Sequence, residues 1–332
     1  MPVIRAIFFV ISKSNIYIVN YMQQNRKIIP VILCGGSGSR LSLNNKNNTP
    51  KQFINFGNWT LFDKTLLRIK SSIFDSPIIS TNKKYLKHVK LHLRRNKITK
   101  YKIILEPAKR NTAPAILTAA LINNIPDDQP LIFFTADHLI EKMNIFNKAI
   151  VKNKSNLTNF NVFIFGIKPT SPSSEYGYFK TKKIKKNINK VIKFIEKPNE
   201  AKAKQVIKQK GYWNSGMFYL RKDSIINNFK KYQPKTYRNC LNAVNKAKYK
   251  SNTYYLNKAS FIKATSKSFD YAILEKTKQI NAIKLDIPWS DLGSWKEILK
   301  MYDKNKNKYI KKKNVYYRPW GRYTNLFEGK EF

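Results

Sequence analysis

The sequence predicts an α/β fold in which helices flank a Rossmann-like, mixed and mostly parallel sheet. Short apolar runs alternate with helical patterns along most of the chain, and a glycine-rich loop follows the first run. Such alternation is typical of parallel strands, because each needs a long crossover before its neighbour. The 332 residues, 42% of them hydrophobic, are enough for one large core or two.

The first strand is expected at residues 28–33, where IIPVIL is apolar and β-branched. Three glycines follow it: Gly35, Gly36 and Gly38. Glycine has no Cβ, so backbone N–H groups can approach a phosphate closely. Arg40 and Lys51 add fixed positive charge after this loop. We therefore interpret the loop as a polyphosphate site.

The same alternation predicts the remaining elements. Helices are expected over residues 60–71, 83–95, 112–124, 142–152, 199–208, 223–232 and 235–247. Strands are expected over residues 77–81, 102–105, 129–135, 162–167 and 190–196. The helix at 112–124 has the clearest pattern, and Asn111 is positioned to cap it.

The formal net charge is +45, from 64 Lys and Arg against 19 Asp and Glu. Such an excess can indicate binding to nucleic acid or to a membrane surface. The lysines are scattered through every segment, however, without an arginine-rich stripe or an RNA-binding motif. Codon bias in an A/T-rich genome explains this spread more simply, so we expect no specific nucleic-acid partner.

Cysteine and histidine usage argues against a disulfide framework and a zinc site. Cys34 and Cys240 lie far apart, which fits a reducing cytoplasm. His88 and His92 have helical i, i+4 spacing, but Val89 stands where a zincin would carry Glu. We expect both histidines to be solvated on a helix.

Residues 1–26 are expected to be an N-terminal extension. Their apolar core of about six residues is shorter than a signal h-region and far shorter than a membrane span, so no membrane association is expected. An extra N-terminal strand is the alternative.

The combination GG-x-G-x-R, PKQF and EPAKRNTAP resembles the signature of sugar-phosphate nucleotidylyltransferases, and PKQF resembles the mannose-1-phosphate guanylyltransferase branch. The resemblance implies a nucleotide-diphospho-sugar transferase fold with a catalytic domain over residues 27–302. Since relatives usually begin just before the first strand, it also implies that translation starts at Met22. It also implies GTP and mannose 1-phosphate as substrates and GDP-mannose as a product for polysaccharide biosynthesis. Whether the chain is a homodimer stays open.

The resemblance assigns Arg40 and Lys51 to catalysis and a further set of residues to nucleotide binding. That set is Leu33, Gly35, Gly36, Ser37, Gly38, Arg110, Asn111 and Thr112. Without the resemblance, Asn111 is only a helix cap and Arg110 a surface cation.

Asp137 follows the strand predicted at residues 129–135, close to where a triphosphate would lie. Mg²⁺ prefers oxygen ligands and bridges to substrate phosphates, so this carboxylate is a candidate metal ligand. The resemblance implies that Asp291, in WSDLGSW, is the second ligand. The alternative for each is an ordinary turn aspartate.

The resemblance implies a sugar-phosphate site formed by residues from three motifs. They are Gly177 and Tyr178 of YGY, Glu196 and Lys197 of EKP, and Asn214 of WNSGMF. It also implies that Gly216 permits close packing and that Asp270 and Glu275 organise the pocket wall. A buried aromatic strand is the structural alternative for WNSGMF.

Two segments depart from the family pattern. Residues 41–46 read LSLNNK where relatives usually have LWPLSR, and Lys does not reproduce bidentate Arg geometry. Residues 303–332 are expected to be a linker and a remnant of a cupin isomerase domain, so we expect no phosphomannose isomerase activity. The alternatives are another sugar-1-phosphate nucleotidylyltransferase and a decayed, non-catalytic polyanion-binding protein.

Overall fold

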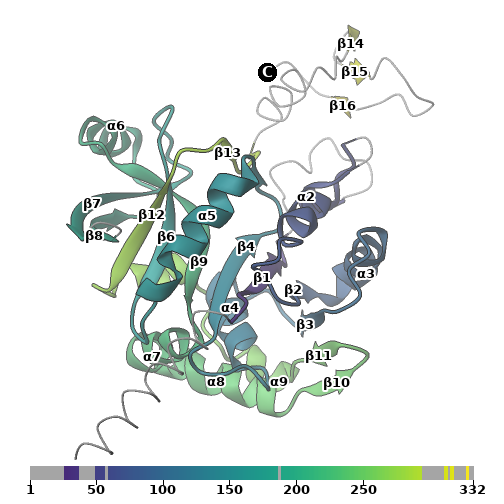
Figure 1. Ribbon diagram of the computed structural model, residues 1–332. Coiled ribbons are helices and arrows are strands. Elements are labelled where there is room, and N and C mark those ends of the chain that lie inside the picture. Colours follow the sequence, from purple (N-terminus) through teal and green to yellow (C-terminus); the bar gives the residue numbers. More distant parts are fainter. Residues whose placement is uncertain are drawn as a thin grey trace, which may run out of the picture.

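The computed structural model describes residues 26–36, 49–56, 59–185 and 188–293, and the backbone of three short strands beyond them (Figure 1). Its main feature is an eleven-stranded sheet with the order β10-β11-β3-β2-β1-β4-β9-β6-β12-β8-β7. The expected α/β fold with a mixed sheet and flanking helices is confirmed. Within the described residues, no helix is both long enough and apolar enough to cross a bilayer.

One half of the sheet is parallel. It consists of β11 (Thr253–Tyr255), β3 (Lys102–Glu106), β2 (Ile78–Asn82), β1 (Ile29–Cys34) and β4 (Pro130–Thr135). Because these strands run in one direction, their carboxyl ends meet at a single edge. In open α/β sheets that edge is where ligands bind.

Most pairings in the other half are antiparallel. It consists of β9 (Tyr212–Arg221), β6 (Val162–Ile167), β12 (Ile280–Leu285), β8 (Ile188–Ile195) and β7 (Gly177–Lys185). β7 pairs with both β8 and β9, so this half curls back on itself. The exception is the parallel pairing of β12 with β6.

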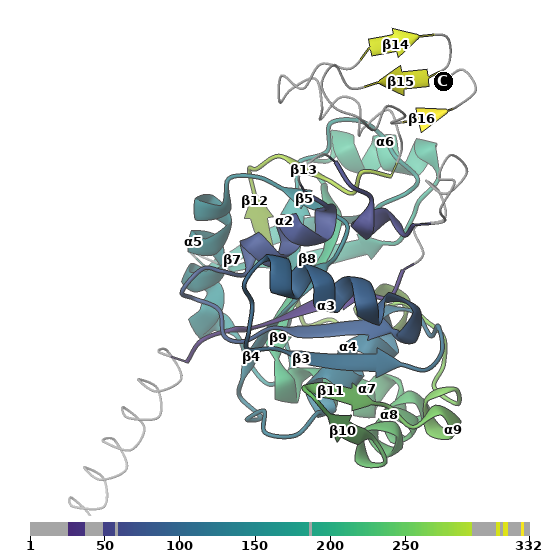
Figure 2. The same cartoon turned by 90° about the vertical axis from the view of Figure 1, so that its right-hand side faces the viewer.

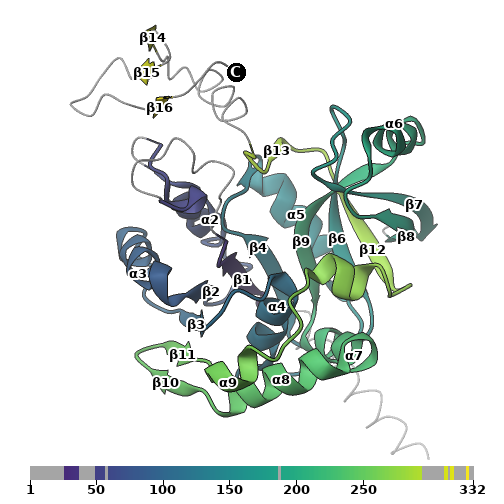
Figure 3. The same ribbon diagram turned by 180° about the vertical axis from the view of Figure 1, so that it is seen from behind.

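Two groups of helices cover the two faces of the sheet. One face carries α4 (Thr112–Leu121), α7 (Lys222–Tyr232), α8 (Pro234–Asn245) and α9 (Lys258–Phe261), which contact one another in sequence order (Figure 3). The other carries α2 (Leu61–Arg68), α3 (Leu86–Arg95), α5 (Met143–Asn153) and α6 (Glu200–Lys208) (Figure 2).

The alternation of strand side chains divides the core between these faces. Val31 packs in the cluster under α4, whereas its neighbour Ile32 packs in the cluster under α2 and α3. Phe133 and Phe134 of β4 divide in the same way. The continuous apolar runs of β1 and β4 therefore reflect strands that are buried on both faces.

The prediction for His92 was wrong. Its side chain is buried, and Nδ1 lies 2.8 Å from Oδ1 of Asp63 on α2. Asn96 also donates to this carboxylate. Burial alone would raise the pKa of Asp63, but the hydrogen bonds from His92 and Asn96 hold that pKa below its ordinary value. His92 thus holds two helices together, while His88 is exposed.

Several strands were not predicted. They are β5 (Leu139–Ile140), β10 (Lys248–Lys250), β11, β12 and β13 (Trp289–Ser290), together with β7. Lysines interrupt the apolar alternation in β7 and β10, and the two-residue strands β5 and β13 are too short to show one. Beyond residue 293, β14 (Ile310–Lys312), β15 (Val315–Tyr317) and β16 (Phe327–Glu328) form a small antiparallel sheet. The predictions for residues 1–25 and for most of residues 303–332 fall outside the described residues.

Candidate active site

A cavity of 340 Å³ lies at the carboxyl ends of β1, β3 and β4. It is lined by six of the residues predicted to bind nucleotide and by one predicted metal ligand: Leu33, Gly35, Gly36, Arg110, Asn111, Thr112 and Asp137. Glu106 and Asp270 also line it. The topology thus brings the glycine-rich loop, the EPAKRNTAP motif and the residues after β4 to one edge of the sheet.

Arg110, Asn111 and Thr112 hold the rim of this cavity in place. The Arg110 guanidinium donates through Nε and Nη2 to the carbonyl oxygen of Ile262, at 3.0 and 2.6 Å. Asn111 has a φ of 63° and caps α4 by accepting from the Thr112 N–H. The Thr112 hydroxyl accepts from the Phe269 N–H at 2.9 Å. The expected cap is confirmed, and these side chains fasten the EPAKRNTAP loop to the segment that follows α9.

Glu106 is a buried carboxyl at the end of β3. Its Oε1 accepts a hydrogen bond from the Ser80 hydroxyl at 2.8 Å and lies beside Gly35. Burial raises the pKa of Glu106 to about 7, against the opposing effect of the Ser80 hydrogen bond. A carboxyl that titrates near neutrality inside a cavity is a functional-site candidate.

Lys51 connects the two predicted metal ligands. It lies on a short 3-10 helix, Lys51–Phe53, and its side chain is buried. Its Nζ is 3.1 Å from Oδ2 of Asp137 and also donates to the carbonyl oxygen of Asp291. A buried ammonium group requires such partners, because an unpaired buried charge is costly.

Asp137 is ionised at neutral pH. Burial would raise the pKa of its carboxyl, but the positive charge of Lys51 and a contribution from His138 hold that pKa below its ordinary value. Burial lowers the pKa of His138, whose ring packs edge-on against Trp289 at 5.4 Å. Asp137 therefore offers a carboxylate beside a neutral imidazole.

A pairing of short strands brings Asp291 to Lys51, which also contacts Asp137. β13 pairs with β5, with Trp289 opposite Ile140 and Ser290 opposite Leu139. The Asp291 carboxylate accepts from the Tyr176 hydroxyl at 2.7 Å and from the Gly293 N–H at 3.2 Å. Both aspartates supply oxygen donors of the type that Mg²⁺ prefers, so the donor set fits that ion. Within the described residues, no cluster of three or more His, Cys, Asp or Glu side chains forms a metal site.

The predicted sugar-phosphate residues gather where β7, β8 and β9 meet. Gly177 pairs with Asn214, and a Cβ added to Gly177 would lie 2.6 Å from Oε2 of Glu196. The Asn214 amide donates to Oδ1 of Asp270 at 2.8 Å. Lys197 follows Glu196 with an exposed side chain and a φ of 45°. We call Gly177, Glu196, Lys197, Asn214 and Asp270 the acidic cluster.

Two carboxyls in the acidic cluster have raised pKa values. Burial, followed by the charge of Asp270, raises the pKa of Glu196 to about 7. Burial is also the main reason why the pKa of Asp270 rises to about 6, against the hydrogen bond from Asn214. Near neutral pH Glu196 is present in both its protonated and its ionised form, so it can donate a hydrogen bond to a hydroxyl or accept one from it.

Two predictions about this region need correction. The Tyr178 ring is fully buried in the core, where its hydroxyl accepts from the Ser173 N–H at 2.9 Å, so it does not line the site. Gly216 is explained by its φ of +71°, not by close packing, since an added Cβ would approach no atom closer than 3.7 Å. Ser37, Gly38 and Arg40 lie outside the described residues.

Glu106 and Tyr176 were missed as site residues. Glu106 opens the EPAKRNTAP motif and, like Asp137, is an acidic residue at the end of a parallel strand, so the signal was present. Tyr176 directly precedes the two predicted residues of YGY. Its role depends on Asp291, 115 residues away, and no local pattern could have shown it.

Comparison with known proteins gives this geometry a context. The sequence profile described as nucleotidyl transferase matches residues 29–308. The chain belongs to the nucleotidyl transferase family. The match extends over both halves of the sheet and over both predicted metal ligands.

The chain is also similar to individual members of this family. It is 34% identical over 294 residues to the alginate biosynthesis protein AlgA of Pseudomonas fluorescens, covering 87% of this chain and 61% of that protein. It is 35% identical over 278 residues to mannose-1-phosphate guanylyltransferase of Salmonella muenchen, covering 82% and 59%. The chain thus spans about three fifths of the length of these relatives.

A solved structure supports the fold. The crystal structure described as mannose-1-phosphate geranyltransferase from Thermus thermophilus superposes with a TM-score of 0.72 at 22% identity. The superposition covers 85% of this chain and 81% of that one. The expected nucleotide-diphospho-sugar transferase architecture is therefore confirmed.

Proposed function

We propose that this nucleotidyl transferase is a mannose-1-phosphate guanylyltransferase that converts GTP and mannose 1-phosphate into GDP-mannose and pyrophosphate. Two of its relatives point in this direction: the Salmonella muenchen protein carries that name, and AlgA is named for alginate biosynthesis. GDP-mannose would then supply polysaccharide assembly.

The observation that carries this proposal is the position of Asp270. Its side chain lines the 340 Å³ cavity and also accepts from Asn214 in the acidic cluster. A nucleotide in the cavity and a sugar at the cluster would therefore lie on the two sides of one carboxyl. A transfer between two bound substrates requires such adjacency.

The chain's residues support an in-line displacement. An oxygen of the sugar phosphate attacks the α-phosphorus of GTP, the bond to the β-phosphate oxygen breaks, and pyrophosphate leaves with its electron pair. No general base is needed, since a phosphate monoester is already anionic near neutral pH. Lys51 is positioned to stabilise phosphate charge, and backbone N–H groups near Gly35 and Gly36 can approach the triphosphate.

Asp137 and Asp291 would hold Mg²⁺. This ion commonly binds one or two carboxylates together with substrate phosphates and water, and when bound it neutralises charge on the phosphates. Lys51 would keep the Asp137 carboxylate and the Asp291 backbone in fixed positions before the substrates bind.

Glu106 supports guanine as the base. Guanine presents two adjacent donors, N1–H and the N2 amino group, and an ionised carboxylate presents two acceptor oxygens. Glu106 lies in the cavity, and its hydrogen bond from Ser80 occupies only one lone pair of Oε1. Thymine and uracil have one such donor, so they would leave one oxygen of this carboxylate unpaired.

The decisive experiment measures pyrophosphate release by the purified chain with GTP, Mg²⁺ and mannose 1-phosphate. The Asp137→Asn variant should lose at least about a hundredfold in rate. Asp75→Asn is the matched control, because Asp75 is exposed and its N–H bonds to Ile28 at the opposite edge of the sheet. The control should retain full activity.

Substrate panels separate this proposal from its alternatives. Turnover that prefers glucose 1-phosphate or dTTP would replace it with another sugar nucleotidylyltransferase. A folded protein without turnover, which binds RNA or heparin with steep salt dependence, would contradict the enzymatic function and favour a polyanion-binding protein.

A further inference from the structure

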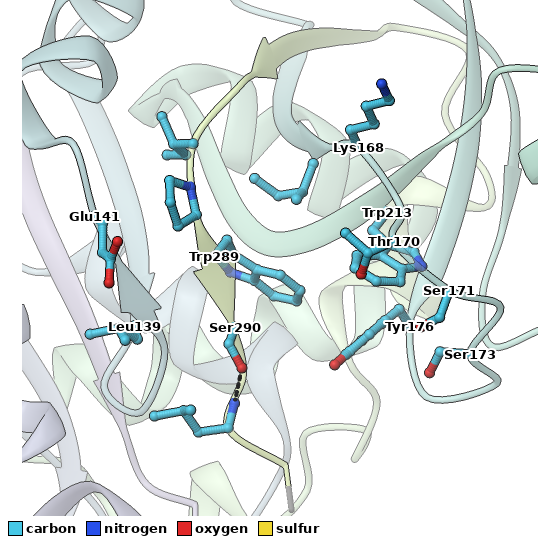
Figure 4. Close-up of a pocket in the computed structure, with 14 residues that line it drawn as sticks. Leu139, Glu141, Lys168, Thr170, Ser171, Ser173, Tyr176, Trp213, Trp289 and Ser290 are labelled. Carbon is cyan, nitrogen blue, oxygen red and sulfur yellow. Dashed lines mark hydrogen bonds between the residues drawn. The ribbon is translucent and has the colours of Figure 1, made fainter. Parts of the chain in front are cut away.

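Helix α2 carries two buried polar side chains, Asp63 and Arg68, that the proposed reaction does not use. Neither side chain lines the 340 Å³ cavity. Neither lines the 460 Å³ cavity beside Asp291, which has Tyr176 and Trp289 in its wall and is part of the same reaction site (Figure 4). Burying an ionised group is costly, so both residues require an explanation.

Arg68 supports the turn that carries Asp137. The residue is only 4% exposed, and its Cζ lies 5.4 Å from the centroid of the Phe134 ring. Nη2 donates to the carbonyl oxygen of His138 at 3.0 Å, whereas Nε and Nη1 have no acceptor among the described residues. This buried cation therefore bonds to the backbone directly next to Asp137.

Asp63 supports the segment that carries Lys51. Its carboxylate holds His92, whose ring stacks on Phe53 with 5.6 Å between the ring centroids and an interplanar angle of 22°. Phe62 of α2 meets the same Phe53 ring edge-on at 5.5 Å. Phe53 is buried and ends the 3-10 helix that Lys51 begins. Helix α2 therefore holds this short helix both directly and through His92.

The two supports converge on one ion pair. Lys51 and Asp137 are 86 residues apart in the sequence, and 3.1 Å separates their charged groups. Asp63 and Arg68, by contrast, are five residues apart, which is about 7.5 Å along a single helix. One rigid helix can therefore hold two otherwise independent segments at a fixed separation.

We propose that helix α2 is a positioning element that fixes the Lys51 ammonium group against the Asp137 carboxylate. Arg68 acts from one end of the helix and Asp63 from the other, and neither lines the cavity in which the substrates would react. Electrostatic stabilisation of phosphate charge depends on groups that are fixed before the substrates bind. The catalytic consequence rests on the proposed function, whereas the position of Lys51 does not.

The first test measures the surroundings of Lys51 without any substrate. Labelling with acetic anhydride, followed by mass spectrometry of the peptide that contains Lys51, gives the acetylation rate of its amine. Arg68→Met removes the hydrogen bond to the turn, and His92→Phe keeps the stacked ring but loses the contact with Asp63. In both variants Lys51 should be acetylated about tenfold faster, as expected for the loss of one hydrogen bond to a charged group. Arg94→Met, at an exposed position of α3, is the matched control and should label at the wild-type rate.

Steady-state pyrophosphate release then measures the effect of this geometry on the reaction. In Arg68→Met and His92→Phe, kcat should fall about tenfold to a hundredfold, while KM for GTP and for mannose 1-phosphate stays within about twofold of the wild-type values. A purely structural role would lower the melting temperature and leave kcat unchanged. Arg94→Met should keep the wild-type constants.

Labelling of Lys51 at the wild-type rate in either folded variant would overturn the proposal, and so would faster labelling without a change in kcat. If the wild type makes no GDP-mannose, the proposed function fails, and the labelling rates alone decide whether α2 positions Lys51. Arg68→Lys keeps the buried cation but loses the planar fork, so it should show a smaller rise in labelling. This milder variant decides the outcome if Arg68→Met and His92→Phe fail to fold.

Discussion

The two halves of the sheet organise their site residues differently. In the parallel half, polar residues follow directly after strand ends, and one contiguous motif, residues 106–114, supplies six of the residues that line the cavity. In the curled half, the acidic cluster takes its members from β7, β9, the turn after β8 and the segment 270–275. The site residues of the parallel half can therefore be identified from short motifs. Those of the other half come together only through strand register.

The buried ionisable groups of the two halves also have different partners. In the parallel half, the buried Lys51 is paired with Asp137, which keeps that carboxyl ionised. In the curled half, burial raises the pKa of both Glu196 and Asp270, and the charge of Asp270 adds to the effect on Glu196. We infer that the first arrangement suits charge stabilisation on phosphates and the second suits hydrogen bonding to neutral hydroxyls.

The largest expected effect comes from removing the charge that joins the two predicted metal ligands. Lys51→Met should lower kcat by about a hundredfold to a thousandfold, because phosphate charge and Asp137 both lose their buried partner. Steady-state pyrophosphate release measures it, and Lys100→Met, an exposed lysine, is the control. Unchanged kcat in a folded Lys51→Met protein would contradict the assignment.

The next prediction tests whether the parallel half binds the nucleotide independently of the curled half. Glu106→Gln should raise KM for GTP by about tenfold to a hundredfold, because an amide offers one acceptor where the carboxylate offers two. KM for mannose 1-phosphate should change little. An equal rise in KM for both substrates would show that the two halves do not bind their substrates separately.

The Glu106 carboxyl also predicts a pH dependence. Its pKa, raised to about 7 by burial, leaves the group protonated below that pH and ionised above it. Only the ionised form accepts both guanine donors, so KM for GTP should fall as the pH rises from about 6 to about 8. In the Glu106→Gln variant, KM for GTP should no longer vary with pH. A wild-type KM for GTP that stays constant over this range would argue against guanine binding by Glu106.

Glu196→Gln is the matching change in the curled half. It should raise KM for mannose 1-phosphate by about tenfold, the size expected for one hydrogen bond to a charged group, with KM for GTP almost unchanged. Initial rates with each substrate varied in turn measure both constants. A rise in KM for GTP alone would show that Glu196 does not bind the sugar phosphate.

The smallest effect concerns stability. Gly216→Ala should lower the free energy of unfolding by about 1–2 kcal/mol, because its φ of +71° disfavours a Cβ. Gly36→Ala is the control, since an added Cβ there meets no atom within 4 Å and its φ is not in the left-handed region. Urea titration compares the two, and equal losses would mean that backbone conformation is not the cause.

Much of the parallel half could be predicted from sequence. The strands around the cavity, the Asn111 cap and the position of Asp137 after a strand all follow from local periodicity and strand-end chemistry. His92 was mispredicted because its i, i+4 spacing with His88 says nothing about Asp63, which reaches it from another helix. Glu106 could have been found with the reasoning that found Asp137.

The sequence by itself determined the fold class, the family and the motifs that reach the site, because periodicity and short contiguous motifs are local properties of the chain. Only the tertiary structure decided which of those residues meet. The pairing of β13 with β5 brings Asp291 to Lys51, and the register of β7 on β9 sets Gly177 beside Asn214 while Tyr178 turns into the core. Register and crossover are relations between distant segments, so no local pattern encodes them.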